Sequence, residues 1–281
     1  MKELEFIISI GVNYGQVLTG GVVAFHKLAY EIAKRGYKVT IFTEPAFPHK
    51  NIITRKNSSE NNLNFEFDKN NTVILPSIDW KNKNRLPNVC RWVLHHLNKD
   101  LIRHVEKTDK IYNFGDFVTC GLTEYGKLTT FDYHDGLFSN ENRERNGKVC
   151  YILNKKTPKN YKKILKVLNA HPIGNWKQMG SFNYLKEKFN EYEYFVTFDD
   201  KSFYTLGAAM CGCKSIILNL NETPEDYRTN NPIQKYGVAC GIEDIAWAEE
   251  TIDKVQEYVN QLIVEDGKTI DQFIYDNTSK I

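Results

Sequence analysis

Short apolar, β-branched runs alternate with amphipathic helical segments along nearly the whole chain of 281 residues. The first such unit runs from a buried-strand pattern at residues 5–12, through a helix expected from Val22 to Lys34, into a second strand at residues 38–43. Strand, helix and strand in this order form a βαβ unit, whose strands are parallel and whose crossover is right-handed. The chain is therefore expected to be an α/β protein built on parallel sheets.

The alternation continues on both sides of a polar stretch, residues 136–148, whose composition is typical of a hinge. Because strands and helices alternate in both halves, the sequence predicts two doubly wound, Rossmann-like lobes facing one another. Later strands are expected at residues 72–76, 110–114, 128–133, 149–153, 194–198, 214–218 and 236–240. Helices are expected at residues 88–105 and 243–263 and within the segments 154–169, 199–212 and 221–228.

The charge of the chain argues against some partners. Lys and Arg number 37 and Asp and Glu 35, so the net charge is only +2. No overall field draws the protein to nucleic acid, no nucleic-acid partner is expected, and an anionic ligand has to be held by local groups. The apolar residues 6–10 are too few to span a membrane and lack the features of a signal peptide. A cytoplasmic protein without a transmembrane segment is expected, and peripheral membrane contact stays open.

The cysteines and carboxylates indicate no metal site. The six cysteines form no CxxC pair, have no histidine at zinc spacing, and are expected to be reduced thiols in the core. The chain also lacks a carboxylate pair of the DxD kind. A site for a divalent metal ion is therefore not expected.

A glycine pair, Gly20 and Gly21, opens the first predicted helix at the carboxyl end of the first strand. Ligands of doubly wound sheets bind at this edge, where a helix N-terminus offers free backbone N–H groups. Without a Cβ the backbone can approach a phosphate or sugar and can adopt a positive φ. The spacing is neither GxGxxG nor that of a P-loop, which argues against a dinucleotide dehydrogenase and a P-loop NTPase. The alternative is a tight turn without a ligand.

Several segments resemble GT-B glycosyltransferases. GGVVAFHKLAYEIAKRGYKVTIFT is similar to the opening of these enzymes, and FVTFDDKSFYTLGAAMCGCKSIIL resembles the E-x7-E donor segment of the retaining members. Together with NVCRWVLHHLN, RNGKVCYILNKK and YGVACGIEDIAWAEETI, their order resembles glycosyltransferase-like proteins of polysaccharide and lipopolysaccharide clusters over nearly the whole chain. The resemblance implies an acceptor lobe at residues 1–140, a donor lobe at residues 141–266 across a cleft, and a C-terminal helix at residues 267–281 that returns to the first lobe.

The E-x7-E pattern, anchored on Gly212, places its two acidic positions at Asp199 and Gly207. Asp199 keeps a carboxylate, whereas Gly207 supplies none. What the second carboxylate does for the nucleotide in the family must then come from elsewhere or be missing. This departure keeps open a second reading, a GT-B-like sugar-nucleotide-binding protein with weak or lost catalysis.

Two lysines are candidates for holding the leaving diphosphate of a sugar nucleotide. Lys155 and Lys156 follow the strand at residues 149–153, at the carboxyl edge, where fixed cations would stabilise the departing charge without a metal. The resemblance implies the same role, because this position in GT-B enzymes often holds Arg or Lys on the diphosphate. The alternative is a pair of solvated lysines at a helix start. Arg143 and Arg145, in the polar hinge, are weaker candidates.

Polar residues also follow the strand at residues 194–198. Asp199 and Asp200 end it, and Ser202 and Thr205 open the next helix, where they could hydrogen-bond the hydroxyls of a sugar or ribose. The alternative is that one of the aspartates caps the helix. By contrast, Thr223 in TPEDYR is explained as a helix N-cap and needs no ligand.

His134 and Asp135, near the end of the first lobe, are candidates for handling the acceptor hydroxyl. An imidazole beside a carboxylate can take up or orient a hydroxyl proton, and Asp199 completes the candidate catalytic set. Adjacent residues of an extended chain point to opposite sides, so a structural role is the alternative.

The residues and the resemblance together predict a metal-independent glycosyltransferase without a cofactor. It is expected to move a sugar from a nucleotide-sugar donor on the second lobe to a glycan or other hydroxyl acceptor on the first.

Replacing Lys155 and Lys156 together by alanine is expected to weaken sugar-nucleotide binding by at least about tenfold, because charge-assisted contacts contribute roughly 1.5–3 kcal/mol each. Isothermal titration calorimetry with a confirmed donor measures the loss, and circular dichroism checks that the fold is intact. Unchanged binding would remove both lysines from the donor site.

Overall fold

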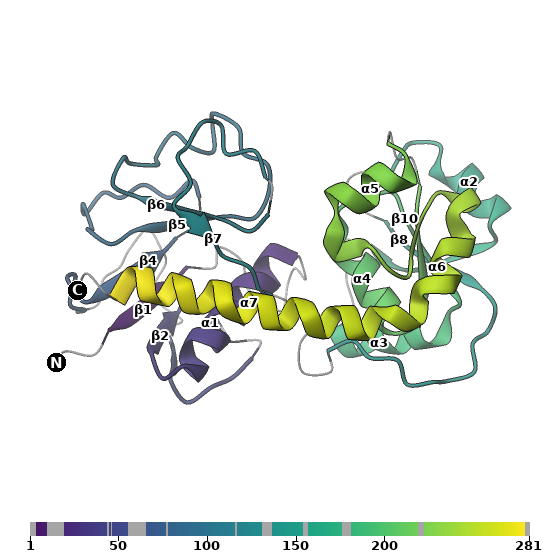
Figure 1. Cartoon of the computed structure of the whole chain (residues 1–281), viewed down its shortest axis with the longest axis horizontal. Coiled ribbons are helices and arrows are strands. Elements are labelled where there is room, and N and C mark those ends of the chain that lie inside the picture. Colours follow the sequence, from purple (N-terminus) through teal and green to yellow (C-terminus); the bar gives the residue numbers. More distant parts are fainter. Residues whose placement is uncertain are drawn as a thin grey trace. The chain divides into compact units, whose positions relative to one another are not determined.

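The computed structural model describes two compact units of the chain (Figure 1). Unit 1 comprises Met1–Asp132 and Ile263–Ile281, and unit 2 comprises Tyr133–Leu262. The borders expected from the sequence fall after residues 140 and 266. The described residues are 4–9, 20–43, 45, 47–55, 66–76, 78–115, 117–130, 137–153, 157–175, 181–218 and 222–278.

Unit 1 is built on parallel strands only, among the residues that the structure describes. One sheet has the order β3-β2-β1-β4 and a second the order β5-β6-β7, and a parallel bridge between Ile74 and Val89 connects β4 to the start of β5. The strands are β1 (Glu5–Ile8), β2 (Lys38–Ile41), β3 (Ile52–Thr54), β4 (Thr72–Leu75), β5 (Cys90–Val93), β6 (Lys110–Asn113) and β7 (Gly126–Lys127). All four residues of β1 are buried, as expected for a central strand of a parallel sheet.

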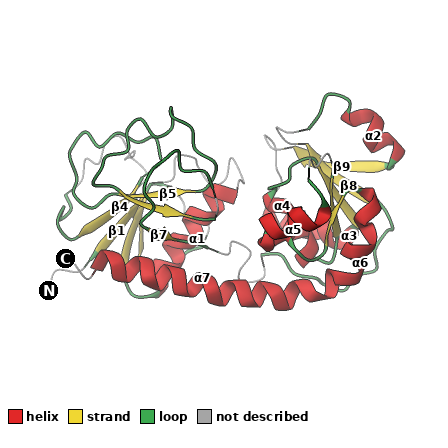
Figure 2. Cartoon of the chain, turned by 45° about the horizontal axis from the view of Figure 1, so that its top comes forward, coloured by secondary structure: helices red, strands yellow, loops and turns green. Residues whose placement is uncertain are grey.

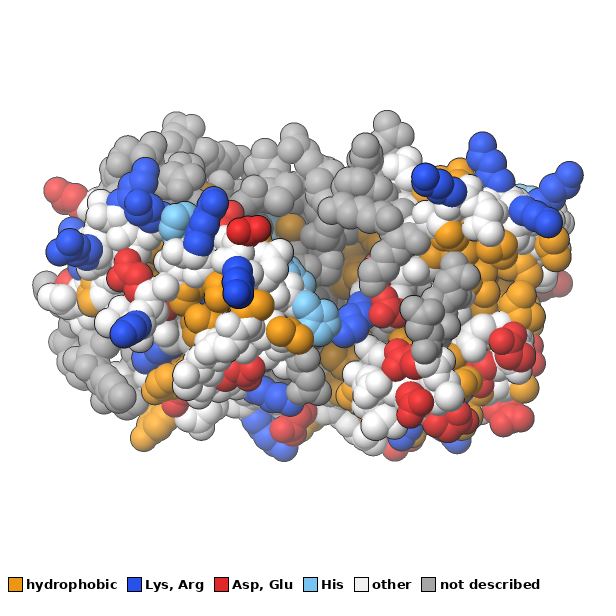
Figure 3. All heavy atoms as spheres, turned by 90° about the horizontal axis from the view of Figure 1, so that it is seen from above, with side chains coloured by type: hydrophobic (Ala, Val, Ile, Leu, Met, Phe, Trp, Pro, Cys, Tyr) orange, Lys and Arg blue, Asp and Glu red, His pale blue; other side chains and the backbone are white. Residues whose placement is uncertain are grey.

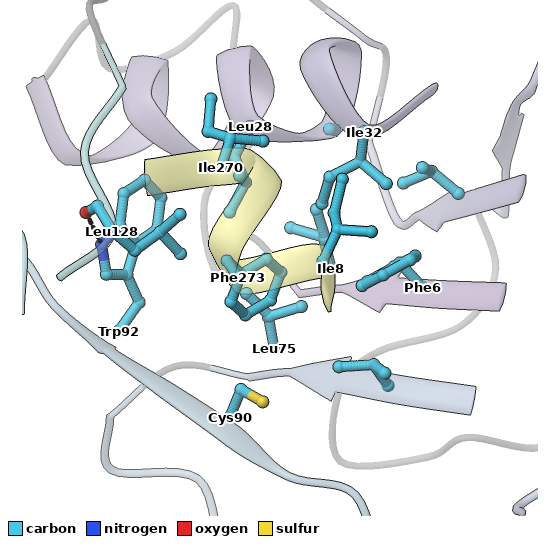
Figure 4. Close-up of a cluster of buried hydrophobic side chains, with 14 of the residues drawn as sticks. Phe6, Ile8, Leu28, Ile32, Leu75, Cys90, Trp92, Leu128, Ile270 and Phe273 are labelled. Carbon is cyan, nitrogen blue, oxygen red and sulfur yellow. Dashed lines mark hydrogen bonds between the residues drawn. The ribbon is translucent and has the colours of Figure 1, made fainter. Parts of the chain in front are cut away.

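Two helices, α1 (Gly20–Lys34) and α7 (Val255–Thr278), pack on the core of unit 1 (Figure 4). The C-terminal residues Ile270, Phe273 and Ile274 lie in this core, and the ring of Phe273 contacts those of Phe6 and Tyr112. The helical spacing of these three apolar residues is the reason, because it puts them on one face of α7.

The prediction of a helix at residues 88–105 is wrong. The segment instead begins as strand β5, which buries Cys90 and Trp92 in the main core and places Val93 in a separate cluster with Leu97 and Ile111. Cys90 and Trp92 thus lie on one side of β5 and Val93 on the other, as expected for a strand, in which successive side chains point to opposite faces. Beyond β5 the chain continues in turns, one of which is held by Asn98, whose Oδ1 accepts hydrogen bonds from the backbone N–H groups of Asp100 and Leu101.

A buried ion pair holds these turns against β5. The Nε of Arg91 lies 2.8 Å from Oδ2 of Asp109, and both side chains are almost completely buried. Arg91 also donates hydrogen bonds to the carbonyl oxygens of Trp80, at 2.9 Å, and His104, at 3.3 Å. One side chain therefore connects the segments before and after β5.

The strand expected at residues 128–133 is also not observed where it can be checked. Residues 128–130 form no strand, and β7 is limited to Gly126 and Lys127. The hydrogen bond from Nε1 of Trp92 to the carbonyl oxygen of Leu128, 2.8 Å long, holds this segment on the core instead (Figure 4).

Unit 2 contains a five-stranded parallel sheet of order β12-β11-β10-β8-β9, with helices packed around it (Figure 2). Its strands are β8 (Val149–Leu153), β9 (Ala170–Asn175), β10 (Tyr194–Thr197), β11 (Lys214–Ile217) and β12 (Val238–Cys240). Its helices are α2 (Tyr161–Val167), α3 (Phe182–Glu191), α4 (Phe203–Met210), α5 (Pro224–Asn230) and α6 (Ile245–Thr251). The sequence analysis did not anticipate β9 and α3, nor β3 of unit 1.

The long helix expected at residues 243–263 is interrupted. Helix α6 ends at Thr251, and the 3₁₀ turn Ile252–Lys254 separates it from α7. The break lies beside Gly237, whose φ is +69° and where a Cβ would come within 2.9 Å of Val255. The N-cap expected at Thr223 is confirmed, since its side chain accepts a hydrogen bond from the backbone N–H of Asp226.

Asp266 of α7 is partly buried, and its Oδ2 atom is shielded from solvent. Burial raises its pKa from the ordinary value of 3.8 to about 7, and the nearby charges of Glu265 and Glu31 act in the same direction. A hydrogen bond with Thr129 and the charge of Lys27 act against the shift. Its Oδ2 makes no hydrogen bond with any described residue.

The Asp266→Asn variant is expected to be more stable than the wild type at pH 8, by on the order of 1–3 kcal/mol, and to lose this advantage near pH 4. The sign follows from the raised pKa of Asp266: between about pH 4 and pH 7 the folded state keeps a proton that the unfolded state releases, so stability falls as the pH rises. Urea unfolding over this pH range measures the difference. Glu257→Gln, at an exposed position of the same helix, is the control. An equal gain at every pH would contradict the assignment.

Candidate functional site

The sheet of unit 2 reverses its strand order at β8. The chain passes from β8 to β9 on one side and then returns to β10 on the other. In open parallel sheets, ligands bind at the carboxyl ends of the strands where this reversal occurs. Among the described residues, the segment at this point is Phe198–Ser202, which follows β10 and leads into α4. Asp199, Asp200 and Ser202 therefore lie at the position where the fold favours a ligand.

The loop between β10 and α4 is shaped by its own hydrogen bonds. The backbone N–H of Asp199 donates to Oγ1 of Thr197 at 3.1 Å, and Oδ1 of Asp199 accepts from the N–H of Lys201 at 3.2 Å. The N-cap of α4 is Ser202, whose Oγ accepts from the N–H of Tyr204. The alternative in which an aspartate caps this helix is therefore wrong, and the carboxylate of Asp199 stabilises a turn before it.

Two residues far along the chain fasten this loop. The buried Tyr227, on α5, directs its hydroxyl at the carbonyl oxygen of Asp200, 2.7 Å away, and at Oε1 of Gln234. Gln234 in turn donates from Nε2 to the carbonyl oxygen of Ser202 at 3.1 Å. Burial raises the pKa of Tyr227 well above its ordinary value, so the hydroxyl keeps its proton. The sequence analysis missed both residues, because nothing in their local pattern indicates the loop that they contact.

Thr205 lies deeper than the loop. Its side chain is completely buried, Oγ1 has no hydrogen-bond partner among the described residues, and its carbonyl oxygen accepts from Oγ of Ser215 on β11. Gly207, two residues further on, is also buried in α4. The described loop thus carries the carboxylates of Asp199 and Asp200. The second acidic position of the E-x7-E pattern, Gly207, supplies no carboxylate.

Gly20 and Gly21 are the first two residues of α1 in unit 1. The strand order β3-β2-β1-β4 reverses at β1, so α1 follows the strand at which that sheet favours a ligand. Gly21 has a helical backbone, so positive φ is not the reason for this glycine. A Cβ at Gly21 would lie 3.6 Å from Cδ1 of Leu94, an ordinary contact. Glycine in a helix costs about 1 kcal/mol relative to alanine, and packing against the described residues does not require it.

The remaining predicted site residues fall outside the described part of the chain. His134, Asp135, Lys155 and Lys156 belong to segments that the structure does not describe, and their roles stay predictions.

The two weaker arginine candidates make structural contacts. The guanidinium of Arg145 donates to the carbonyl oxygens of Phe189 and Tyr192, at the end of α3, and of Cys211, at the end of α4. Arg143 forms an ion pair with Glu141 at 2.5 Å. Both contacts explain these arginines without an anionic ligand.

Neither a membrane span nor a metal cluster is found in the part of the chain that the structure describes. No described helix combines the length and apolar character needed to cross a bilayer. The described His, Cys, Asp and Glu residues form no group of three or more that could hold a metal ion.

The Tyr227→Phe variant is expected to lower the free energy of unfolding by about 1–2 kcal/mol, because it removes the buried hydroxyl that lies within hydrogen-bond distance of two partly buried acceptors, the carbonyl oxygen of Asp200 and Oε1 of Gln234. Tyr258→Phe is the matched control, since it removes a hydroxyl that bonds the carbonyl oxygen of Pro232 at an exposed position. Urea unfolding measures both. Equal losses of unfolding free energy would show that the buried hydroxyl of Tyr227 stabilises the protein no more than the exposed one of Tyr258.

Comparison with known proteins relates the whole chain to one fold. No protein-family model matches the sequence, and no curated protein matches it either. The structure is similar to sucrose-phosphate synthase from Thermosynechococcus elongatus, with 11% identity, a TM-score of 0.53 and 100% of each chain covered. It is also similar to WaaG, a glycosyltransferase involved in lipopolysaccharide biosynthesis, with 10% identity, a TM-score of 0.51 and coverage of 98% of this chain and 99% of WaaG. The chain thus has the α/β fold of the GT-B glycosyltransferases, as the sequence predicted.

Proposed function

We propose that this protein is a glycosyltransferase that moves a sugar from a nucleotide-sugar donor to a hydroxyl group of a glycan or other acceptor. The observation that carries the proposal is the loop between β10 and α4, whose two aspartates lie at the strand-order reversal of a GT-B fold. WaaG, one of the similar structures, is a glycosyltransferase of lipopolysaccharide biosynthesis, which favours a glycan acceptor.

The donor is assigned to unit 2. Carboxylates such as those of Asp199 and Asp200 accept hydrogen bonds from sugar or ribose hydroxyls, and the hydrogen bonds of Tyr227 and Gln234 hold their loop in place before a ligand arrives. Lys155 and Lys156 are proposed to stabilise the diphosphate as it leaves, in place of a metal ion or other cofactor. Ser202 and Thr205, together with Gly20 and Gly21 of unit 1, complete the proposed donor-binding set; in the present structure Ser202 caps α4 and Thr205 is buried.

The acceptor is assigned to unit 1, and the reaction to the cytoplasm. Gly20 and Gly21 leave the start of α1 without side chains, which gives a sugar or a phosphate access to backbone N–H groups. His134 and Asp135, which fall within the bounds of unit 2 and not of the first lobe as expected, are proposed to orient the acceptor hydroxyl and to take up its proton, while Asp199 contacts the transferred sugar.

A second candidate function is the binding of a sugar nucleotide without efficient transfer. Gly207, which is buried in α4, favours it, because glycine supplies no carboxylate at the second position of the E-x7-E pattern. The two functions differ in turnover. Release of nucleoside diphosphate in the presence of a glycan acceptor supports transfer, and donor binding without such release supports the second candidate.

A thermal-shift screen against UDP-, GDP- and ADP-sugars is expected to identify a donor that raises Tm, because a ligand of the native state adds stability by mass action. Asp199→Asn is then expected to weaken that donor by at least about tenfold, since a charged hydrogen-bond acceptor is lost. Asp253→Asn, at an exposed position of unit 2, is the control. A screen in which no sugar nucleotide raises Tm would contradict the proposal.

A further inference from the structure

One stretch of unit 2 concentrates positive charge. Residues 154–186 contain eight lysines and neither aspartate nor glutamate. The whole chain has a net charge of only +2, so the residues outside this stretch are net acidic. The lysines are Lys155, Lys156, Lys159, Lys162, Lys163, Lys166, Lys177 and Lys186.

Four of these lysines form one exposed face, which we call the lysine face: Lys159, Lys162, Lys163 and Lys166. Their spacing of three and four residues places them on one side of α2 and of the turn before it. The opposite side of α2 packs into the core of unit 2 through Leu165, with Tyr161, Ile164 and Leu168 partly buried beside it. The lysine face is therefore turned to solvent by the burial of the apolar side.

The lysine face has no charge compensation within the described residues. None of its four ammonium groups lies within ion-pair distance of a described carboxylate. Other basic residues of unit 2 form ion pairs with carboxylates. Lys159 and Lys163, like Lys162 and Lys166, are four residues apart, a spacing at which like charges repel one another on a helix. The isolated protein thus gains nothing from this arrangement of charges.

An exposed apolar residue borders the lysine face. Val167, which directly follows Lys166, is 80% exposed, more than any other large hydrophobic residue in the described part of the chain. In Figure 3, Lys and Arg side chains gather beside apolar ones at the end of the view where Figures 1 and 2 show α2. The surface combines fixed positive charge with an apolar contact.

We propose that the lysine face docks unit 2 on the surface of an anionic phospholipid bilayer. Clusters of four or more lysines on an amphipathic helix are attracted to anionic headgroups, and lysine stems extend along an apolar boundary while their ammonium groups stay in the polar layer. Nucleic acid fits this surface less well, because the face contains neither arginine nor an exposed aromatic side chain on which a base could stack.

The place of the lysine face in the sheet connects it to the candidate site. Helix α2 follows β8, so its N-terminal end lies at the carboxyl edge of the sheet, the edge that also carries Asp199. Docking through α2 would bring this edge close to lipid headgroups. The docking itself does not depend on sugar transfer.

Vesicle co-sedimentation of the full chain tests this inference. The wild type is expected to bind vesicles of phosphatidylcholine mixed with phosphatidylglycerol, not to bind phosphatidylcholine alone, and to dissociate as NaCl is raised. Replacing the four lysines of the lysine face by glutamine is expected to weaken binding by at least about tenfold. The matched control has the same change of charge at four exposed lysines of unit 1: Lys81→Gln, Lys83→Gln, Lys99→Gln and Lys107→Gln.

Three results would overturn the proposal. The first is wild-type protein that does not bind the anionic vesicles, and the second is an equal loss of binding in both glutamine variants. The third is tighter binding to a single-stranded oligonucleotide than to the vesicles at the same NaCl concentration, which would make the face a nucleic-acid surface. Circular dichroism melting confirms that each variant is folded. Binding without any donor sugar nucleotide separates this test from that of the proposed function.

Discussion

A parallel sheet has to be covered on both faces, and this requirement organises unit 1. Helices α1 and α7 contribute to its main core, but the described parts of the connections from β4 to β5 and from β5 to β6 contain no helix. A second cluster replaces helices there, with Trp80 and Leu86 packed against Ile7 and Ile74 of the sheet. The irregular segments are thereby part of the core, although they lack regular backbone hydrogen bonds.

Segments of this kind need other partners for their polar groups, and Arg91 supplies several of them. Its pairing with Asp109 and its hydrogen bonds to backbone carbonyl oxygens satisfy groups that a helix would satisfy internally. The arrangement depends on both charges, because removing one partner of a buried ion pair typically costs about 3–5 kcal/mol. Unit 1 is therefore held together by one helix from each end of its sequence and by a buried ion pair between its later strands.

The candidate site of unit 2 depends on a similar long-range restraint. A loop at the end of β10 would be free to adopt many conformations, but Tyr227 of α5 and Gln234 of the 3₁₀ turn after it bind its carbonyl oxygens. Such a loop can present carboxylates in a defined position before a ligand binds, which reduces the ordering that binding requires. The lysine face, by contrast, is a surface feature set by the pattern of α2 alone.

Local patterns in the sequence determined a large part of the fold. The strands at β1, β2, β4, β6, β8, β10, β11 and β12, the helix α1 and the cap at Thr223 were predicted, because apolar periodicity and capping depend on neighbouring residues. The position of Asp199 at the end of a strand followed from the same patterns. The order of the strands, which makes that position a reversal point, is a property of the sheet as a whole.

Tertiary structure decided the rest. Residues 88–105 have an amphipathic pattern that also fits a helix, but in the folded chain β5 pairs with β6 and Arg91 contacts Asp109, eighteen positions away. The hydrogen bond from the Tyr227 hydroxyl to the carbonyl oxygen of Asp200, twenty-seven positions away, likewise depends on a contact between distant residues. The sequence by itself determined which segments are strands or helices where local periodicity was strong. Only the folded chain decided which polar groups meet, because ion pairs and hydrogen bonds between distant segments leave no periodic trace in the sequence.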